Sequence, residues 1–471
     1  MNAPVCAMPG SQVQREPARG LELPVDPVLP QLARALDPVA MAAVFALPLR
    51  QRSLTVERCE VERIKYRPGR NCTLSYRLSL RDARTGELID QRVAARLGTA
   101  ADATARQARA ATLTWVDSLA GPSLLPVPGL HMLTWWWPND AKLRATRVLG
   151  DATRLGALVI PEVAGVLGAP SASATHTIAI AQYVPEHRVT AQVDLQWQRD
   201  GHPFAQRVYA KASREPEGAV AHAQLRALQD SPAWRAGRLR TPRAWLWQPE
   251  WQLHWQEGLP GQALLDVGPV EAARLAPALG AQLAALHGTP VPTSRAIDLA
   301  SLRARLAEVN AVLAPALPAA SGALRQASAR LAHGLRWLDA APVATLHGDL
   351  HPRNVLADGD RLALIDLDGL RRGPTLLELG AWVADGIYRA VLDGAPPMRD
   401  APAWRALLDG YGHAGGRVPA EAALAWSAAW SLLTQRVWRC VVNLKPGRYA
   451  IAPALVVLAA RLAVASSLEA A

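Results

Sequence analysis

Three residues in the C-terminal half have the types and the spacing that metal-assisted phosphoryl transfer requires. Asp349 lies within His347-Gly348-Asp349, Asn354 follows it five positions later, and the short apolar stretch 362–365 then ends at Asp366. A transferred phosphoryl group is already highly charged, so a protein must supply positioning, metal ions and a group that orients the acceptor hydroxyl. A carboxylate on a fixed loop can accept the proton of that hydroxyl, which is the role expected for Asp349.

Asn354 and Asp366 offer oxygen atoms to a metal ion. Mg²⁺ prefers hard oxygen ligands and shares them with phosphates, and an amide oxygen and a carboxylate supply two. An Asn in a loop is by itself most often a turn residue. At this spacing from Asp349, however, the pair predicts a Mg²⁺ site next to a nucleotide.

The same loop permits a second interpretation. His347, Asp349 and His351 form a His-x-Asp-x-His cluster, which could ligate a transition metal in a metal-dependent hydrolase. The other nine histidines form no comparable cluster, and the spacing of Asn354 and Asp366 would be left unexplained. The hydrolase therefore stays an alternative to the phosphotransferase.

The elements that must position this loop differ between the two halves of the chain. Residues 72–80 alternate apolar and polar side chains, as a half-buried strand does, and 91–97 read as the returning strand of a hairpin. Beyond residue 260 leucines recur at helical spacing in 302–313 and 324–338. Pro277 is expected to start or interrupt a helix that carries Leu279 to Leu286.

The hairpin has a second copy. Residues 183–197 repeat the pattern of 66–80 at an offset of 117, and 206–211 repeat 91–96 after a turn, 199–201, that is two residues shorter. We expect an internal repeat of a β-hairpin followed by a helix. The whole chain is predicted to be α+β and two-lobed, with a β-rich N-terminal half and a mostly helical C-terminal lobe. The expected parts are a loose tail (1–20), a region with the first repeat (21–165), a nucleotide-binding N-lobe (166–255) and a helical C-lobe (256–471).

The loop resembles the catalytic loop of the aminoglycoside phosphotransferase and choline kinase-like superfamily, which has the protein kinase-like fold. That loop reads His-Gly-Asp-x-x-x-x-Asn and precedes a strand that ends in a metal-binding Asp. The resemblance implies Asp349 as catalytic base and Asn354 and Asp366 as Mg²⁺ ligands, with His347 and His351 shaping the loop. Segments 255–261 and 283–287 are similar to the family's inter-lobe segment and to the helix after it.

The resemblance also requires a cation on a central strand of the small lobe, where it holds the α- and β-phosphates. Lys211, in Val208-Tyr209-Ala210-Lys211, fits that strand and is one of only four lysines among 51 basic residues. The first repeat has Arg96 at the equivalent position. Arg presents a wide fork where Lys presents a compact charge, so the first repeat is expected to be structural or degenerate.

Three departures from the family pattern bear on activity. The helix expected at 218–228 has no acidic partner for Lys211, although Glu215 and Glu217 lie just before it. Asp366 is followed by Leu367-Asp368 where protein kinases have Phe-Gly. Glu378 stands where the family usually has an Asp that braces the loop. These departures leave open a pseudokinase-like binding module as an alternative function.

Composition narrows the choice of partners. The net charge of +11 allows an anionic partner, but the Arg residues are spread along the sequence and no nucleic-acid motif is present. Four scattered cysteines favour a reducing compartment, and the first twenty residues contain no apolar run of signal-peptide length. The apolar stretch 451–468 contains Arg461, so we expect a buried packing helix there and not a membrane span. We therefore expect a cytoplasmic enzyme that uses Mg²⁺ and ATP or GTP to phosphorylate a hydroxyl of a small molecule (an aminoglycoside, sugar or amino alcohol), with its oligomeric state open.

Overall fold

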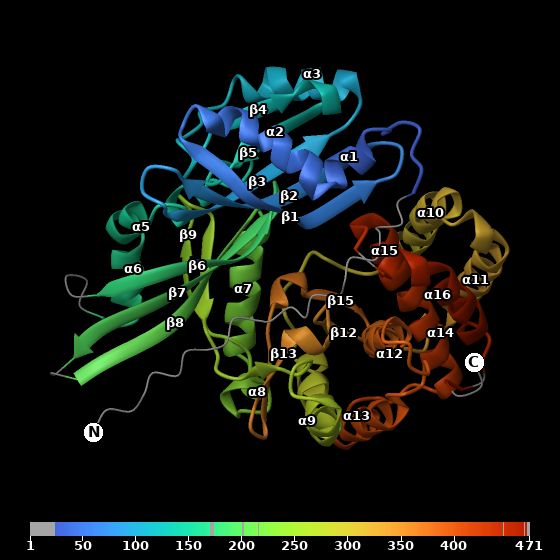
Figure 1. Ribbon diagram of the computed structural model, residues 1–471. Coiled ribbons are helices and arrows are strands. Elements are labelled where there is room, and N and C mark those ends of the chain that lie inside the picture. Colours follow the sequence, from blue (N-terminus) through green and yellow to red (C-terminus); the bar gives the residue numbers. More distant parts are fainter. Residues whose placement is uncertain are drawn as a thin grey trace.

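A computed structural model describes residues 24–169, 174–199, 202–214, 216–445, 447–465 and 467–468. The expected tail at 1–20 and most of the turn at 199–201 lie outside this part of the chain. The described chain is α+β, with sheets in the N-terminal half and helices in most of the rest, which confirms the predicted fold class (Figure 1).

The first sheet is antiparallel and five-stranded, in the order β1-β2-β3-β5-β4. Its strands are β1 (Leu54–Arg67), β2 (Asn71–Asp82), β3 (Leu88–Leu97), β4 (Leu124–Val127) and β5 (Met132–Trp136). The helices of this region are α1 (Leu32–Leu36) and α2 (Pro38–Arg50) before the sheet and α3 (Ala100–Ala110) after β3. Because α2 packs against β1, its buried side chains Met41, Phe45 and Leu49 close one face of the sheet.

The second sheet has the same design, in the order β6-β7-β8-β10-β9. Its strands are β6 (Thr175–Val184), β7 (Arg188–Arg199), β8 (His202–Ser213), β9 (Ala244–Gln248) and β10 (Leu253–Glu257). The helices are α4 (Thr146–Leu149), α5 (Ala152–Leu158) and α6 (Ile160–Val166) before the sheet, and α7 (Glu217–Gln229) and α8 (Pro232–Arg235) after β8. We call residues 26–136 copy 1 and residues 140–257 copy 2.

The strand registers of the two copies agree. Thr73 pairs with Arg96 between β2 and β3, and Thr190 pairs with Lys211 between β7 and β8. The repeat expected from the sequence is therefore confirmed, and it extends from the hairpin to the entire five-stranded sheet.

A shared aspartate network shows that the duplication also includes the segments before each sheet. In copy 1, Asp26 accepts hydrogen bonds from Tyr66 Oη (2.7 Å) and from the N–H of Gly69 (2.8 Å). In copy 2, Asp140 accepts from Tyr183 Oη (2.7 Å) and from the N–H of Glu186 (2.8 Å). Each carboxylate thus ties the start of its copy to the turn between the first two strands of the sheet.

The C-terminal part consists mainly of helices, with two small sheets, β11-β13-β14 and β12-β15. The strands are β11 (Gln262–Ala263), β12 (Val343–Leu346), β13 (Val355–Asp358), β14 (Arg361–Leu364) and β15 (Arg371–Pro374). The α-helices are α9 (Pro269–His287), α10 (Leu299–Ala316), α11 (Ser321–His333), α12 (Thr375–Leu392), α13 (Ala401–His413), α14 (Glu421–Ser431), α15 (Trp438–Asn443) and α16 (Arg448–Leu462).

The expectation for Pro277 is wrong, because α9 begins at Pro269 and runs through Pro277 to His287. A proline removes one helical hydrogen bond. At this proline α9 packs closely against α13: a Cβ on Gly280 would lie 2.0 Å from the Leu407 carbonyl oxygen, and one on Gly410 would lie 2.1 Å from that of Pro277. Two glycines therefore let the two helices approach at backbone distance.

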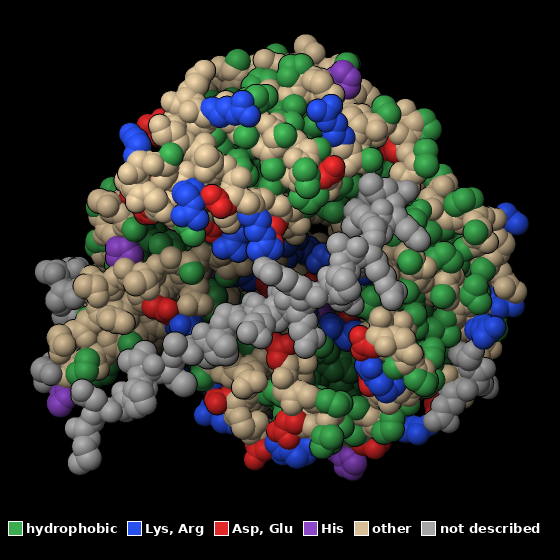
Figure 2. All heavy atoms as spheres, in the orientation of Figure 1, with side chains coloured by type: hydrophobic (Ala, Val, Ile, Leu, Met, Phe, Trp, Pro, Cys, Tyr) green, Lys and Arg blue, Asp and Glu red, His purple; other side chains and the backbone are tan. Residues whose placement is uncertain are grey.

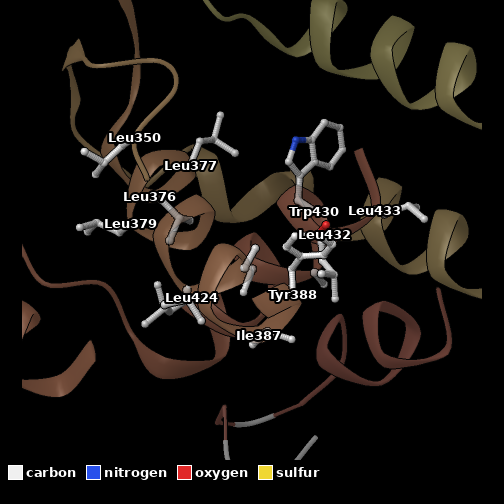
Figure 3. Packing of buried hydrophobic residues seen from close by; sticks show 14 of the residues in the cluster. Leu350, Leu376, Leu377, Leu379, Ile387, Tyr388, Leu424, Trp430, Leu432 and Leu433 are labelled. Atoms are coloured by element: carbon white, nitrogen blue, oxygen red, sulfur yellow. The ribbon is translucent and has the colours of Figure 1, made fainter. Parts of the chain in front are cut away.

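The largest hydrophobic core lies among the C-terminal helices. Figure 3 shows side chains of α12 and α14, among them Leu376, Ile387 and Leu424, packed together under Leu350, which follows Asp349 in the chain. The apolar stretch near the C-terminus forms α16, which packs against α11 and α14 as expected. In the described part of the chain, every helix is too short or too polar to span a bilayer.

Copy 1 lies across the top of copy 2 and the C-terminal helices in Figure 1. On the C-terminal side, α15 packs against β1, and Leu444, just after α15, is buried in the core of copy 1. Copy 1 is therefore joined to both lobes of the expected nucleotide cleft.

Candidate functional site

We call residues 347–354, which the sequence predicts to be catalytic, the catalytic loop. It runs from β12 to β13, and tight backbone packing sets its shape. Gly348 has a φ of 82°, and a Cβ at this position would lie 2.2 Å from the carbonyl oxygen of Gly369. Only glycine combines that conformation with such a close approach. The glycine of His-Gly-Asp thus lets the loop pack against the segment that follows Asp366.

Glu378, in the first turn of α12, holds the loop backbone. Its carboxylate accepts hydrogen bonds from the N–H of His347 (3.0 Å), the N–H of Gly348 (2.8 Å) and Nε2 of His287 (3.0 Å). Burial raises the pKa of this carboxyl, but the interactions with His287, His347 and Gly348 outweigh it and bring the pKa below its ordinary value. Glu378 thus holds the loop backbone from the position where the family pattern has an Asp.

One carboxylate oxygen of Asp349 is paired with an arginine, and the other is accessible. Its Oδ1 accepts a hydrogen bond from Nη2 of Arg439 (2.9 Å), and its Oδ2 lies 3.9 Å from Nε2 of His351. Burial raises the pKa of Asp349, but the charge and hydrogen bond of Arg439, together with the charges of His351 and Arg436, bring the net pKa below the ordinary value. The group is therefore ionised at neutral pH and can accept a proton at Oδ2.

Asn354 and Asp366 are joined through the backbone. The N–H of Ile365 donates to the Asn354 carbonyl (2.9 Å), and Nδ2 of Asn354 donates to the Asp349 carbonyl (2.9 Å). The Asn354 side-chain amide is thus oriented by its nitrogen, which leaves its oxygen for another partner. Asp366 has a φ of 59°, a left-handed conformation that is uncommon for a residue other than glycine.

The oxygens of this corner fit a hard divalent cation. Asp366 and Asp368 supply two carboxylates and Asn354 supplies an amide oxygen, which is the donor chemistry that Mg²⁺ prefers. Burial raises the pKa of Asp366, but the charges of Lys211 and Arg188 lower it far below its ordinary value. The group is therefore a carboxylate at any physiological pH.

Lys211 joins copy 2 to this corner across 155 residues of sequence. Its Nζ lies 2.7 Å from Oδ1 of Asp366 and 2.6 Å from Oδ2 of Asp368. Burial lowers the pKa of Lys211, but the two carboxylates more than restore it, and the net pKa is above the ordinary value. The structure thus brings together a cation on β8 and the carboxylates that follow β14.

The helix on which the family pattern places an acidic partner of Lys211 carries a histidine here, and this histidine contacts a second one next to Lys211. His254 on β10 pairs in register with Lys211, and its Nδ1 lies 3.0 Å from Nδ1 of His222 on α7. Burial lowers the pKa of both rings, and the charge of Lys211 lowers that of His254 further. Glu217 makes no ion pair with Lys211, and Glu215 lies outside the described residues. Asp366 and Asp368 are the carboxylates that pair with Lys211 in the described chain.

The turn between β6 and β7 is held by copy 1. Glu186 has a φ of 59°, where the equivalent residue of copy 1, Gly69, has a φ of 65°. The Glu186 carboxylate forms ion pairs with Arg96 (3.0 Å), Arg106 (3.4 Å) and Lys142 (3.6 Å). Arg96 and Arg106 belong to copy 1 and Lys142 to copy 2, so two of the three cations tie copy 1 directly to the turn that leads to Arg188.

Basic side chains gather between the two copies although they are spread through the sequence. A cleft of about 200 Å³ is lined by the basic residues Arg63, Lys65, Arg67, Arg96, Lys142 and Arg214. Figure 2 shows Lys and Arg side chains below copy 1, around the hollow near the centre of that view. Such a field attracts anions toward the cleft.

The histidine cluster considered as a metal site is not assembled as one. His347 is fully buried, with Nε2 2.9 Å from the Ile365 carbonyl oxygen, a contact that joins the loop to the strand before Asp366. In the part of the chain that the structure describes, no three His, Cys, Asp or Glu side chains are grouped so that they could hold a metal. The hydrolase interpretation therefore gains no support from the geometry.

One site residue was missed from the sequence. Arg439 lies 90 residues after Asp349, on α15, and is surrounded by residues of ordinary helical character. No motif marks it, because its proximity to Asp349 depends on how α15 packs beside the loop.

Comparisons with known proteins place this site in a family. Residues 186–426 match the sequence profile described as the phosphotransferase enzyme family. No curated protein sequence matches the chain.

Solved structures with similarity to the chain include a choline/ethanolamine kinase family protein from Mesorhizobium loti (17% identity, 64% of this chain, 97% of that chain, TM-score 0.43). An aminoglycoside phosphotransferase in ternary complex with ADP and hygromycin B has 14% identity over 64% of this chain and 98% of its own, with a TM-score of 0.43. The aminoglycoside phosphotransferase of Alicyclobacillus acidocaldarius has 15% identity over 60% and 90%, with a TM-score of 0.40.

The matched segment begins at the turn that contains Glu186, includes Lys211 and the whole catalytic loop, and ends in α14. It spans slightly more than half of the 471 residues. This chain belongs to the phosphotransferase enzyme family.

Proposed function

We propose that this protein transfers the γ-phosphate of ATP or GTP to a hydroxyl group of a small molecule, with Mg²⁺ as cofactor. The observation that carries the proposal is the convergence of Lys211 on Asp366 and Asp368, at 2.7 and 2.6 Å. It joins the cation of one lobe to the oxygen ligands of the other. The ionised carboxylate of Asp349 lies on the same loop as Asn354, whose side-chain amide donates a hydrogen bond to the backbone carbonyl of Asp349.

Each of these residues has a separate role in the proposed reaction. Lys211 leaves the two aspartates for the nucleotide phosphates when the nucleotide binds, since a polyphosphate offers it more negative charge. Mg²⁺, held by Asn354 and Asp366 with Asp368 beside them, would neutralise charge on the phosphates. Oδ2 of Asp349 accepts the proton of the acceptor hydroxyl as its oxygen attacks phosphorus.

Thermal unfolding with nucleotide tests the proposal. The protein is unfolded alone, with Mg·ATP, with Mg·GTP, and with each nucleotide in EDTA. A ligand that binds only the folded state stabilises it by about 2.7 kcal/mol at a hundredfold excess over Kd. We expect a Mg²⁺-dependent shift for at least one nucleotide, and we expect Asp366→Ala to abolish it. Asp360→Ala, an exposed aspartate of the same hairpin, serves as the matched control.

Absence of a shift with either nucleotide would favour the pseudokinase-like binding module. A shift that persists in EDTA and in Asp366→Ala would show nucleotide binding without the proposed metal site. Nucleotide hydrolysis separates the two functions further, since a binding module shows no Mg²⁺-dependent turnover at any acceptor concentration.

A further inference from the structure

A cavity of about 360 Å³ opens beside Asp349. Its walls come from α10, the catalytic loop, α12 and the segment from the end of α14 to α15. Leu350, Leu377 and Trp430 form part of its apolar lining, and Figure 3 shows them along one edge of the packed cluster. A hydroxylated molecule in this cavity would lie next to the proposed base.

An irregular helical segment forms the polar wall of the cavity. Residues Leu432–Val437 are π-helical, and such insertions are found frequently at functional sites. Ser431, Thr434 and Gln435 line the cavity from this segment and its edge. The Ser431 side chain is 1% exposed, and its Oγ has no hydrogen-bond partner among the residues that the structure describes. A buried hydroxyl without a partner is costly, and a polar ligand in the cavity would supply one.

Three guanidinium groups line the cavity. Arg439 contacts Asp349, and Arg305 contacts Glu308 (2.8 Å) and the Thr434 carbonyl (2.6 Å). Arg371 donates to the carbonyls of Gly369 and Gly348, and no carboxylate of the described chain lies within ion-pair distance of it. Burial lowers the pKa of Arg371, which also lies in the fields of Glu378, Arg295 and Asp349. Each guanidinium has five N–H donors, so all three retain donors for a ligand.

The carboxylates that line the cavity already bind other groups of the protein. The lining has two carboxylates, Glu378 and Asp349. Glu378 is 4% exposed and holds two loop amides and His287, so it cannot receive a ligand. Asp349 is paired with Arg439 through Oδ1 and has only Oδ2 to offer. A polycationic acceptor would meet three guanidiniums and a single available carboxylate oxygen.

We infer that the acceptor is an anionic hydroxyl compound, a sugar or polyol that carries a carboxylate or phosphate group. The inference rests on the proposed phosphotransferase function and excludes aminoglycosides and quaternary amino alcohols as the preferred acceptors. Arg305 and Arg439 bind the anionic group, since guanidinium forms paired hydrogen bonds with carboxylate and phosphate. The π-helical segment binds the hydroxyl groups of the acceptor, and the apolar wall packs against its carbon skeleton.

The transfer step balances with these groups. The acceptor oxygen forms a bond to the γ-phosphorus while the bond from that phosphorus to the β,γ-bridging oxygen breaks. The electron pair of the broken bond leaves with the nucleoside diphosphate, and the proton of the hydroxyl goes to Oδ2 of Asp349. The product is a phosphate ester that carries more negative charge than the acceptor.

Four candidate acceptors that share a six-carbon sugar skeleton and differ in charge test the inference. Glucose, glucosamine, gluconate and glucose 6-phosphate are compared at a saturating concentration of whichever of Mg·ATP and Mg·GTP shifts unfolding. The readouts are release of the nucleoside diphosphate and, in parallel, thermal shift with a non-hydrolysable analogue of the same nucleotide. We expect gluconate or glucose 6-phosphate to exceed glucose in kcat/KM and in stabilisation, with glucosamine last. Preference for glucosamine, equal response to all four compounds, or response to none would overturn the inference.

Two variants and a control test whether the cavity arginines cause the preference for anionic acceptors. Arg305→Gln and Arg439→Gln should each lower the ratio of kcat/KM for the anionic compound to that for glucose by about tenfold or more, as expected for a charged hydrogen bond. The ratio cancels any loss of base function that affects both compounds. Arg303→Gln removes an exposed arginine from the same helix, outside the cavity, and should leave the ratio unchanged. An unchanged ratio in both cavity variants would contradict the inference.

The two proposals fail in different ways. If neither Mg·ATP nor Mg·GTP produces a thermal shift, the phosphotransferase proposal fails whatever the panel shows. If one of them binds and the panel shows no preference for anionic members, the phosphotransferase proposal stands and the anionic acceptor is wrong.

Discussion

Arg96 and Lys211 occupy the same register position in two copies of one sheet. Arg96 lies between Thr73 and Leu133, and Lys211 lies between Thr190 and His254. Lys211 pairs with the carboxylates of Asp366 and Asp368, whereas Arg96 pairs with Glu186 from the turn of copy 2. The equivalent cation of copy 1 thus binds a protein carboxylate, which gives copy 1 a structural contact where copy 2 has its proposed nucleotide site.

A double-mutant cycle of Arg96→Gln and Glu186→Gln measures that contact. Both side chains are largely buried, 21% and 10% exposed, so we expect a coupling free energy of about 1–3 kcal/mol in chemical unfolding. Arg77 and Asp90 form the matched control on the same sheet, at 46% and 44% exposure, and their coupling should be about 0–1 kcal/mol. Equal coupling in the two pairs would mean that Glu186 does not join copy 1 to the turn.

Asp349→Asn should abolish turnover and spare nucleotide binding. The amide keeps the shape of the side chain but cannot accept the hydroxyl proton, and a positioned base contributes about 10²–10⁴-fold to the rate. The measurements are ADP release and Mg·ATP thermal shift on the same preparation. Asp409→Asn, on the exposed face of α13, is the control. Retained turnover in Asp349→Asn would refute the assignment of the base.

Arg439→Gln should move the acidic limb of the pH–rate profile to higher pH. Arg439 lowers the pKa of Asp349, and burial alone raises it, so the variant has a higher pKa at this carboxyl. Protonated Asp349 cannot act as base, and activity is therefore lost at a higher pH than in the natural protein. The profile of kcat/KM against pH, with glucose as a neutral acceptor, checks the shift. An acidic limb at the same pH in both proteins would show that Arg439 does not tune the base.

Glu378→Gln should destabilise the protein most clearly above acidic pH. The folded-state pKa of Glu378 lies below the ordinary value of 4.5, so its contribution to stability is present above about that pH and is lost as the pH falls through the folded-state value. We expect a loss of about 1–3 kcal/mol at pH 7, the size of hydrogen bonds to a buried charged group.

Chemical unfolding between pH 3 and pH 7 measures this loss. The difference between the two proteins should shrink toward the acidic end. Glu308→Gln, whose side chain is 58% exposed on α10, should show no such dependence. A loss that is constant over the whole range would mean that the charge of Glu378 does not contribute.

The sequence by itself determined the parts of the site that are close in the chain. His347, Asp349, Asn354 and Asp366 fall within 20 residues, and their spacing reflects a loop and a short hairpin whose geometry is local. The first hairpin was visible for the same reason, since alternation of apolar and polar side chains follows from the pleat of a strand. The matching aspartates of the two copies, Asp26 and Asp140, were not recognised, because single polar residues before short helices carry no periodic signal.

Only the tertiary structure decided which distant groups meet. Lys211 forms ion pairs with Asp366 and Asp368 because the second sheet packs over the segment that follows β14. Arg439 forms an ion pair with Asp349 because α15 packs beside the loop that contains Asp349. The basic residues that are spread through the sequence gather in the cleft between the two copies. Long-range electrostatic contacts depend on how whole elements dock, and docking is set by the burial of apolar surface over many residues at once. The charge in the acceptor cavity is therefore a property of the fold, and no short stretch of sequence contains it.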